Sequence, residues 1–301
     1  MGILTSTLTL PDEALMEVTP NLGYAKIHSG KVRDIFDLGP YLLLIATDRI
    51  SVYDQSFTSG IPGRGILLTQ MSLLFFEHTK DLCTNHIAPL HSTLLQKYLG
   101  AHPELIPRAM VVKKCTPLPI EAIARGYLAG NAWLNYQKTG QVFGLPVPGN
   151  LKEWDSFPQA LFTPSTKSKV TDIPLSEKEA QDKIGSSLYQ QIKPITLKIY
   201  AWGHAYAHKR GLVLVDTKLE FGLDEQSRLT LIDEILTPDS SRYWTEESYK
   251  KGKPKAFDKQ FLRDYVRGLG WKTGPLPLLP EGVIKETQER FLTAWRLLSS
   301  S

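Results

Sequence analysis

Polar and apolar residues alternate along the segment 213–222, and this is the clearest pattern in the chain. Side chains of a β-strand point alternately to opposite faces. The pattern therefore predicts a strand that carries Asp216, Lys218 and Glu220 on one face and hydrophobic residues on the other. Clustered carboxylates beside a lysine suit a metal ion held against phosphate. The solvated face of a half-buried sheet gives the same alternation, so this pattern alone leaves both interpretations open.

The residues that follow this strand favour a functional interpretation. The turn-rich segment 222–228 and the β-prone run 229–233 predict an antiparallel partner strand, which would bring Asp233 towards the same carboxylates. The next segment, 237–242, places a proline, hydroxyl groups, the carboxylate of Asp239 and the guanidinium of Arg242 close together. Such a mixture of turn-forming and ionic groups is typical of a binding loop.

The remaining periodicity predicts an α+β fold with antiparallel sheets and flanking helices. Strands are expected at 24–28, 31–36, 41–46, 110–114 and 120–124. Helices are expected at 68–78, 128–138, 258–267 and 285–298, with two more that are separated by Pro194 and end near Gly211. The stretch 140–166 has little periodicity and predicts a long loop. We place a boundary at the proline-rich segment 115–119. It would divide the chain into a β-rich nucleotide-binding lobe, 1–115, and a larger α+β lobe, 116–301.

Composition narrows the classes of function. The 301 residues carry 35 basic and 31 acidic side chains, a net charge of +4 that gives little support to a nucleic-acid partner. Cys83 and Cys115 cannot form a disulfide framework and indicate free thiols in a reducing cytoplasm. No apolar run reaches the roughly 20 residues that a membrane span needs. We expect a cytoplasmic protein that is a monomer or a small homo-oligomer.

Three other segments carry candidate chemistry. The segment 29–34 places a glycine turn just before Lys31 and Arg33, which could contact a triphosphate, although a surface hairpin is the commoner explanation. Arg125 ends a predicted strand just before Gly126 and a helix start. It could bind phosphate or carboxylate, or it could be a solvated residue. The segment 162–169 has four hydroxyls and two lysines, and by composition it is a polar surface loop.

Taken in order, these segments resemble the SAICAR synthetase family, the phosphoribosylaminoimidazole-succinocarboxamide synthases of purine biosynthesis. The matching motifs are SGKVRD at 29–34, ATDRIS at 46–51, EAIARGY at 121–127, FTPSTK at 162–167, DTKLEFG at 216–222, DEILTPDSSR at 233–242 and FDKQF at 257–261. They span most of the chain, and their combination is specific.

The resemblance implies a two-lobed fold related to the ATP-grasp and kinase-like nucleotide binders. It also implies an ATP-dependent and magnesium-dependent ligase. This enzyme would join the carboxylated aminoimidazole ribonucleotide CAIR to L-aspartate, with release of ADP and phosphate. The carboxylate of CAIR would first become an acyl phosphate, because a carboxylate does not accept an amine directly at neutral pH. The aspartate amine would then displace the phosphate.

Carried over by position, the resemblance also implies a nucleotide and metal site. Lys31 and Arg33 would contact the ATP phosphates, and the backbone from Lys113 to Thr116 would border adenine. Lys218 would neutralise charge between phosphates, and Asp216 would contact the ribose or the metal shell. Magnesium would be held by Glu220 and Asp233.

The substrate side follows in the same way from the resemblance. Arg125 and Arg242 would grip the CAIR phosphate with Ser241 nearby, and Asp239 would orient the incoming amine. The carboxylate or acyl phosphate would meet Lys167, assisted by the hydroxyls of Ser165 and Thr166. Catalysis would then rest on positioning and electrostatics, without a protein nucleophile.

Two departures from the family pattern keep alternatives open. Asn131 stands where the family usually has serine; it can still donate to phosphate but is larger. The segment 171–175 differs from the usual continuation of the Ser-Thr-Lys loop. A related ATP-dependent ligase or kinase with an altered acceptor, or a catalytically silent nucleotide-binding protein, would fit these changes.

Overall fold

The first part of the chain forms a four-stranded antiparallel sheet. A computed structural model describes residues 8–53, 55–167, 172–257 and 259–300. The strand order is β1-β2-β3-β6. The strands are β1 (Ala25–Ser29), β2 (Arg33–Asp37), β3 (Tyr41–Ala46) and β6 (Ala109–Lys113). β3 has the predicted bounds, whereas β2 begins two residues after the predicted start. The reason is the turn before it, in which the Gly30 amide donates to the Arg33 carbonyl at 2.8 Å.

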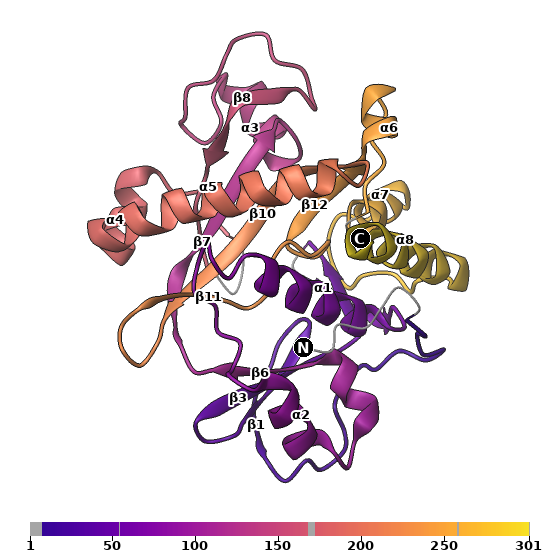
Figure 1. The fold of residues 1–301 in the computed structure, drawn as a ribbon. Coiled ribbons are helices and arrows are strands. Elements are labelled where there is room, and N and C mark those ends of the chain that lie inside the picture. The colour runs from indigo at the N-terminus through magenta and orange to yellow at the C-terminus, as the bar shows by residue number, and fades with distance from the viewer. Residues whose placement is uncertain (1–7, 54, 168–171, 258, 301) are drawn as a thin grey trace.

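Short elements cover and extend this sheet (Figure 1). One face packs against α2 (His91–Leu99) and the 3-10 helix η1 (Pro103–Arg108) through a core that includes Leu43, Leu99 and Val111. A separate two-stranded ribbon, β4 (Arg49–Val52) and β5 (Gln55–Gly60), leads into the next helix. The ribbon carries Arg49, whose guanidinium returns to the turn between β1 and β2.

The second sheet has six strands and contains the charged strand predicted at 213–222. Its main order is β11-β10-β7-β8; β12 pairs with β10, and β9 pairs with β7. The strands are β7 (Thr116–Tyr127), β8 (Ser156–Phe162), β9 (Ser165–Thr166), β10 (Leu212–Leu223), β11 (Leu229–Ile232) and β12 (Ser241–Thr245). The predicted hairpin is confirmed by the antiparallel pairing of β10 with β11. Leu219 and Phe221 are buried in the largest core cluster, as the alternation predicts. The same prediction is wrong for Val215, which packs with Val213 and Trp244 because the strand register shifts between Leu214 and Asp216.

A long helix crosses this sheet, as Figure 1 shows. The prediction of two helices separated by Pro194 is wrong, because α5 (Ser186–His208) is continuous. Pro194 is exposed, and the buried residues Ile192, Thr196 and Ile199 continue on one face past it. Burial of this face outweighs the single backbone hydrogen bond that proline removes. The preceding α4 (Glu177–Ile184) was not predicted, although Ser176 and Glu179 form a capping box at its start.

The predicted long loop at 140–166 is only partly correct, because β8 and β9 lie within it. The helix expected at 128–138 is α3 (Asn131–Thr139), and it begins after Gly130, whose φ is 56°. The change from the first sheet to the second falls between β6 and β7. The division into two lobes at residue 115 stays a prediction.

Helix α1 (Arg64–His78) lies between the two sheets in Figure 1, and three further helices complete the described fold. α1 begins four residues before its predicted start, and Arg64 to Phe76 are all buried. Its main partner among them is α8 (Glu281–Ser299), and the largest core cluster joins Leu67 of α1 to Trp295 of α8. The others are α6 (Glu246–Lys250) and α7 (Gln260–Gly268). The predicted start of the latter at Asp258 lies outside the described residues.

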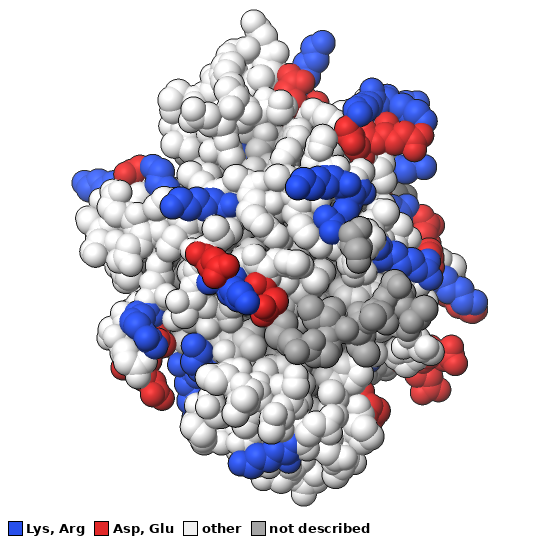
Figure 2. Space-filling view, viewed as in Figure 1, with Lys and Arg blue, Asp and Glu red and all other residues white. Residues whose placement is uncertain are grey.

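The surface and the cysteines agree with the composition. On the face in Figure 2, lysine and arginine residues are interspersed with aspartate and glutamate residues. Cys83 and Cys115 are both free thiols. In the part of the chain that the structure describes, no helix combines the length and apolar character needed to cross a bilayer. The expected lack of a nucleic-acid partner stays a prediction.

A glycine on β7 tests how closely α5 packs on the second sheet. A Cβ atom added to Gly126 would lie 1.8 Å from the Tyr200 hydroxyl oxygen, which donates to the Leu214 carbonyl at 2.9 Å. We expect Gly126→Ala to lower the free energy of unfolding by about 1–3 kcal/mol, as overpacking does in cores. Urea denaturation measures this. Gly149→Ala is the control, because an added Cβ there meets open space. Equal stabilities of the two variants would contradict the packing described.

Candidate active site

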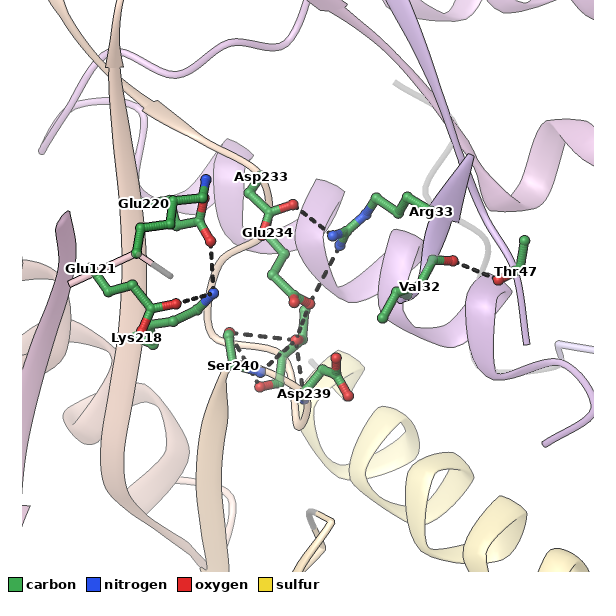
Figure 3. Close-up of polar contacts among 12 residues, drawn as sticks. Val32, Arg33, Thr47, Glu121, Lys218, Glu220, Asp233, Glu234, Asp239 and Ser240 are labelled. Carbon is green, nitrogen blue, oxygen red and sulfur yellow. Dashed lines mark hydrogen bonds and ion pairs between the residues drawn. The ribbon is translucent and has the colours of Figure 1, made fainter. Parts of the chain in front are cut away.

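Two carboxylates face each other across strands β7 and β10. Glu121 pairs directly with Glu220 in the strand register, an arrangement that is unfavourable for like charges. Lys218 lies between them, with its Nζ 2.8 Å from Glu220 Oε1 and 3.3 Å from Glu121 Oε1 (Figure 3). Lys167, which follows β9, pairs with the other oxygen of Glu220. We call these four residues the charged row.

The charged row has strongly shifted proton affinities. Burial would raise the pKa of Glu220, but Lys218 and Lys167 outweigh it and lower this pKa to about 2. Burial would lower the pKa of Lys218, yet Glu220, followed by Glu121, raises it well above the usual range. Burial raises the pKa of Glu121, with Lys218 opposing. At neutral pH the row therefore holds Lys218 as a fixed cation and Glu220 as a fixed anion.

A second ion-pair group connects the two sheets. Arg33 extends from β2 to the segment after β11, where its Nη1 lies 2.6 Å from Asp233 Oδ1 and its Nη2 lies 3.4 Å from Glu234 Oε2. Figure 3 shows this side chain reaching both carboxylates. Asp233 adopts a left-handed backbone, with φ 68°, directly after Ile232, which pairs with Glu220. The hairpin thus brings Asp233 towards the charged row, as the sequence predicts.

The carboxylates fit a magnesium ion only in one mode of binding. Among the described residues, no group of three or more histidine, cysteine, aspartate or glutamate side chains is arranged to hold a metal. Magnesium is commonly bound through one or two protein carboxylates, with phosphate oxygens and water completing the octahedron. Glu220 and Asp233 fit this mode, in which a nucleotide supplies the other ligands.

An arginine-rich group occupies the other end of the same strand face. Arg125 Nη1 lies 2.9 Å from Asp216 Oδ2, and Arg242 Nη1 lies 3.9 Å from the same oxygen. Arg125 also donates through Nε to the Thr163 hydroxyl at 3.0 Å. Two guanidinium groups therefore meet at one carboxylate. We call Arg125, Asp216 and Arg242 the arginine group.

The arginine group lies beside the start of α3. A Cβ atom on Gly130 would lie 2.7 Å from Arg242 Nη2, so a larger residue there would require this guanidinium to move. Asn131 is the first residue of α3 and is exposed. The amide groups at a helix start favour anions, as arginines do. This end of the strand is thus suited to a phosphate.

Some predicted site residues are engaged by other protein groups. The hydroxyl of Ser241 lies 2.8 Å from that of Thr217, on the face of β10 opposite the arginine group. Ser165 donates to Glu121 Oε2 at 3.1 Å, and the Thr166 hydroxyl accepts from the Ile173 amide at 2.9 Å. Their roles towards a substrate stay predictions. Ser168, Lys169 and Thr171 lie outside the described residues.

The nucleotide residues and Asp239 lie as follows. Lys31 is exposed in the turn before β2, and Lys113 ends β6, where its amide donates to the His86 carbonyl at 2.7 Å. Arg33 is largely buried and paired with carboxylates, so its predicted contact with phosphates stays untested. Asp239 is buried and pairs with Arg64 and Lys259, which leaves its predicted contact with an amine untested.

Four charged residues near the site were not predicted. Glu121 could be recognised only from the strand register, which the sequence does not give. Glu234 was not singled out because the resemblance assigns the metal role to the preceding residue, Asp233. The other two are Arg64, in the glycine-flanked segment 63–65, and Lys259, in the motif at 257–261. The pairing of these two cations with Asp239 joins segments that are far apart in sequence.

A partly buried row of paired charges beside an arginine-rich group suits an enzyme that acts on anionic small molecules. The profile of one family, SAICAR synthetase, matches residues 26–275. The chain belongs to the SAICAR synthetase family. The family, the α+β fold and the class of enzyme that the sequence predicts, a ligase of purine biosynthesis, are therefore confirmed.

Individual members of the family are similar to this chain over most of their length. The phosphoribosylaminoimidazole-succinocarboxamide synthase of Thermodesulfovibrio yellowstonii is 43% identical over 282 residues, which cover 92% of this chain and 96% of the relative. The SAICAR synthase of Saccharomyces cerevisiae complexed with SAICAR is similar in structure, with a TM-score of 0.85 and 36% identity, covering 95% of this chain and 98% of that one. A SAICAR synthetase (Type-2) in complex with ADP shares the fold, with a TM-score of 0.63 and 24% identity over 88% of this chain and 96% of that one.

The charged row predicts opposite effects of its two carboxylates on stability. The pKa of Glu220 is about 2 in the folded state and roughly 4.3 in an unfolded chain. Its charge therefore stabilises the fold above the unfolded value, and this stabilisation is lost as pH falls towards 2. We expect Glu220→Gln to cost about 2–3 kcal/mol of unfolding free energy at neutral pH and much less in acid.

Glu121→Gln is the matched control, because the pKa of Glu121 is shifted in the other direction. A raised pKa means that this carboxylate favours the fold most in acid and least above its folded pKa. The loss caused by Glu121→Gln should therefore shrink as pH rises. Urea denaturation across the acidic range measures both variants. The same pH trend in both would contradict the charge assignment.

Proposed function

We propose that this chain condenses CAIR with L-aspartate at the expense of ATP, giving SAICAR, ADP and phosphate, and that it does so in the cytoplasm. The observation that carries the proposal is the single polar face of β10. This face holds Asp216 of the arginine group and Glu220 of the charged row, four residues and about 13 Å apart. One ribonucleotide could thus place its phosphate at the arginine group and its carboxylate at the charged row.

The reaction needs two group transfers. The γ-phosphoryl group of ATP passes to a carboxylate oxygen of CAIR, which forms the acyl phosphate and releases ADP. The aspartate nitrogen then attacks the acyl carbon and loses a proton, and phosphate leaves with the oxygen that received it. Neither step needs a protein nucleophile, so the protein contributes by positioning the reactants and by neutralising charge.

The nucleotide would lie between the first sheet and the charged row. Lys31 would contact its phosphates from the exposed turn, and the backbone beginning at Lys113 would border adenine. Arg33 would hold Asp233 in place through their ion pair, and it would also contact the ATP phosphates directly. Glu220 and Asp233 would hold magnesium, which would supply positive charge against the phosphates during transfer.

The reacting carboxylate would lie against the two lysines of the charged row. The Lys167 side chain is 39% exposed, so it can exchange Glu220 for a substrate oxygen. Lys218 keeps its charge because two carboxylates surround it. Ser165 and Thr166 form β9, directly before Lys167, and their hydroxyls would assist it. These groups stabilise the negative charge on the phosphoryl group during transfer.

The phosphate of CAIR would bind at the arginine group. Arg125 and Arg242 share Asp216, and the Arg242 guanidinium lies beside Gly130 at the start of α3. Asn131 would donate to the same phosphate from the first turn of α3. Ser241 contributes through the backbone of β12, since its hydroxyl meets Thr217 on the opposite face.

The proposal predicts that ADP release requires both CAIR and L-aspartate. Glu220→Ala should lower the rate by about 100-fold or more, because it removes a magnesium ligand and the partner of both lysines. A coupled assay for ADP, run with each substrate omitted in turn, measures this. Glu281→Ala is the control, since that carboxylate is exposed on α8 and pairs only with Lys285 among described groups. ADP formation that is indifferent to both omissions and to Glu220→Ala would refute the proposal.

A further inference from the structure

Asp239 lies in a buried clamp made from three distant segments. Its carboxylate pairs with Arg64, the first residue of α1, and its Oδ1 lies 2.9 Å from Nζ of Lys259, which directly precedes α7. The exposed fractions of the three side chains are 0% for Arg64, 6% for Asp239 and 13% for Lys259. A charge group this well buried is costly to form, and losing one partner leaves an uncompensated charge.

The clamp has two cations for one carboxylate. Burial would raise the pKa of Asp239, but Arg64 and Lys259 lower it, so the carboxylate stays ionised. Arg64 also lies over the ring of Phe291 in α8, with 5.5 Å between the guanidinium carbon and the ring centroid. Because its Oδ1 meets both cations, Asp239 is held from two sides, by α1 and by the residue before α7.

Asp239 belongs to the turn that carries two site residues. The Ser240 carbonyl accepts from the amide of Lys218 at 2.8 Å, so the turn is tied to the middle of β10. The Ser241 amide donates to the Thr237 carbonyl at 2.8 Å, and β12 begins there. Arg242 is the next residue and pairs with Asp216 in the strand register. A displacement of Asp239 would therefore move both Arg242 and the backbone of Lys218.

Arg64 extends the clamp to the nucleotide side. Its Nη1 donates to the carbonyl of Arg49 at 2.6 Å. Arg49 in turn donates through Nη2 to the Gly30 carbonyl at 2.8 Å and to Asp34 Oδ1 at 2.8 Å. Gly30 is in the turn that presents Lys31. A continuous series of polar contacts thus connects this turn to Asp239 through two arginines. Among the described groups, the ion-pair partner of Lys259 is Asp239.

We propose that Arg64, Asp239 and Lys259 are positioning residues that hold the ribonucleotide site in place, and that Arg64 alone also couples this site to the nucleotide turn. This inference rests on the proposed function, because it takes Arg242 as a ligand of CAIR and Lys31 as a ligand of ATP. It assigns Asp239 a role through Arg242 and Lys218 rather than a contact with the incoming amine.

The test uses the affinities of CAIR and of ATP with magnesium, measured separately by calorimetry on the full chain. We expect Lys259→Met to weaken the binding of CAIR about 10-fold, which is within the range of coupling through neighbouring residues. The affinity for ATP should change by less than about 2-fold. Arg64→Met should weaken both ligands by similar factors. In the ADP assay, Lys259→Met should raise the KM for CAIR but not that for ATP, and Arg64→Met should raise both.

Matched variants separate positioning from general destabilisation. Lys259→Arg keeps a cation near Asp239 and should restore most of the CAIR affinity. Arg267→Met in α7 removes an exposed cation, 68% accessible, and should leave both affinities unchanged. If Lys259→Met does not fold, Lys259→Gln takes its place, because it removes the charge but keeps a hydrogen-bond donor. Thermal denaturation shows which variants are folded.

The possible outcomes separate a failure of the proposed function from a failure of the clamp. Wild-type protein that binds neither CAIR nor ATP would overturn the proposed function and this inference with it. If the wild-type protein binds both ligands and folded Lys259→Met, or Lys259→Gln in its place, binds CAIR as tightly as wild type, the clamp alone is overturned. Equal losses of CAIR and ATP affinity in Lys259→Met and Arg64→Met would overturn the assignment of the coupling to Arg64.

Discussion

The ammonium of Lys218 between Glu121 and Glu220 is the interaction on which the rest of the site depends. The pairing of β7 with β10 places two carboxylates opposite each other in a buried position, and only cations between and beside them make this tolerable. The row is thus charge-balanced before any ligand binds. Phosphate and a divalent cation can enter by exchanging partners with Lys167 and Glu220, without adding a net charge that the interior must bear.

Strand β10 also fixes the distance between the arginine group and the charged row. β10 pairs with β7, β11 and β12, so residues from four strands meet on its polar face. Arg125 and Arg242 reach Asp216 from opposite neighbours, while the hairpin to β11 brings Asp233 past Glu220. The spacing between the arginine group and the charged row is therefore fixed by backbone hydrogen bonds. A rigid spacing of this kind suits an enzyme that works mainly by positioning its substrates.

The sequence predicted the features that depend on local order, and it missed those that depend on register or burial. Alternation placed Asp216, Lys218 and Glu220 on one face correctly, because period two is a property of the strand itself. Pro194 misled the helix prediction, since burial on one side of α5 decides its continuity. The pairing of Glu121 with Glu220 and the burial of Asp239 against Arg64 follow from contacts between distant segments, which no local pattern contains. The family resemblance supplied expected roles for Glu220 and Asp239, but not the partners that hold them.

The central claim is that a phosphoryl group moves directly onto the carboxylate of CAIR at the charged row. CAIR labelled with heavy oxygen in that carboxylate tests it most directly, with the released phosphate analysed by mass spectrometry after turnover with ATP and L-aspartate. The account predicts that one labelled oxygen passes to each phosphate, because the acyl phosphate loses the oxygen that received the phosphoryl group. Phosphate released without label during SAICAR formation would contradict it.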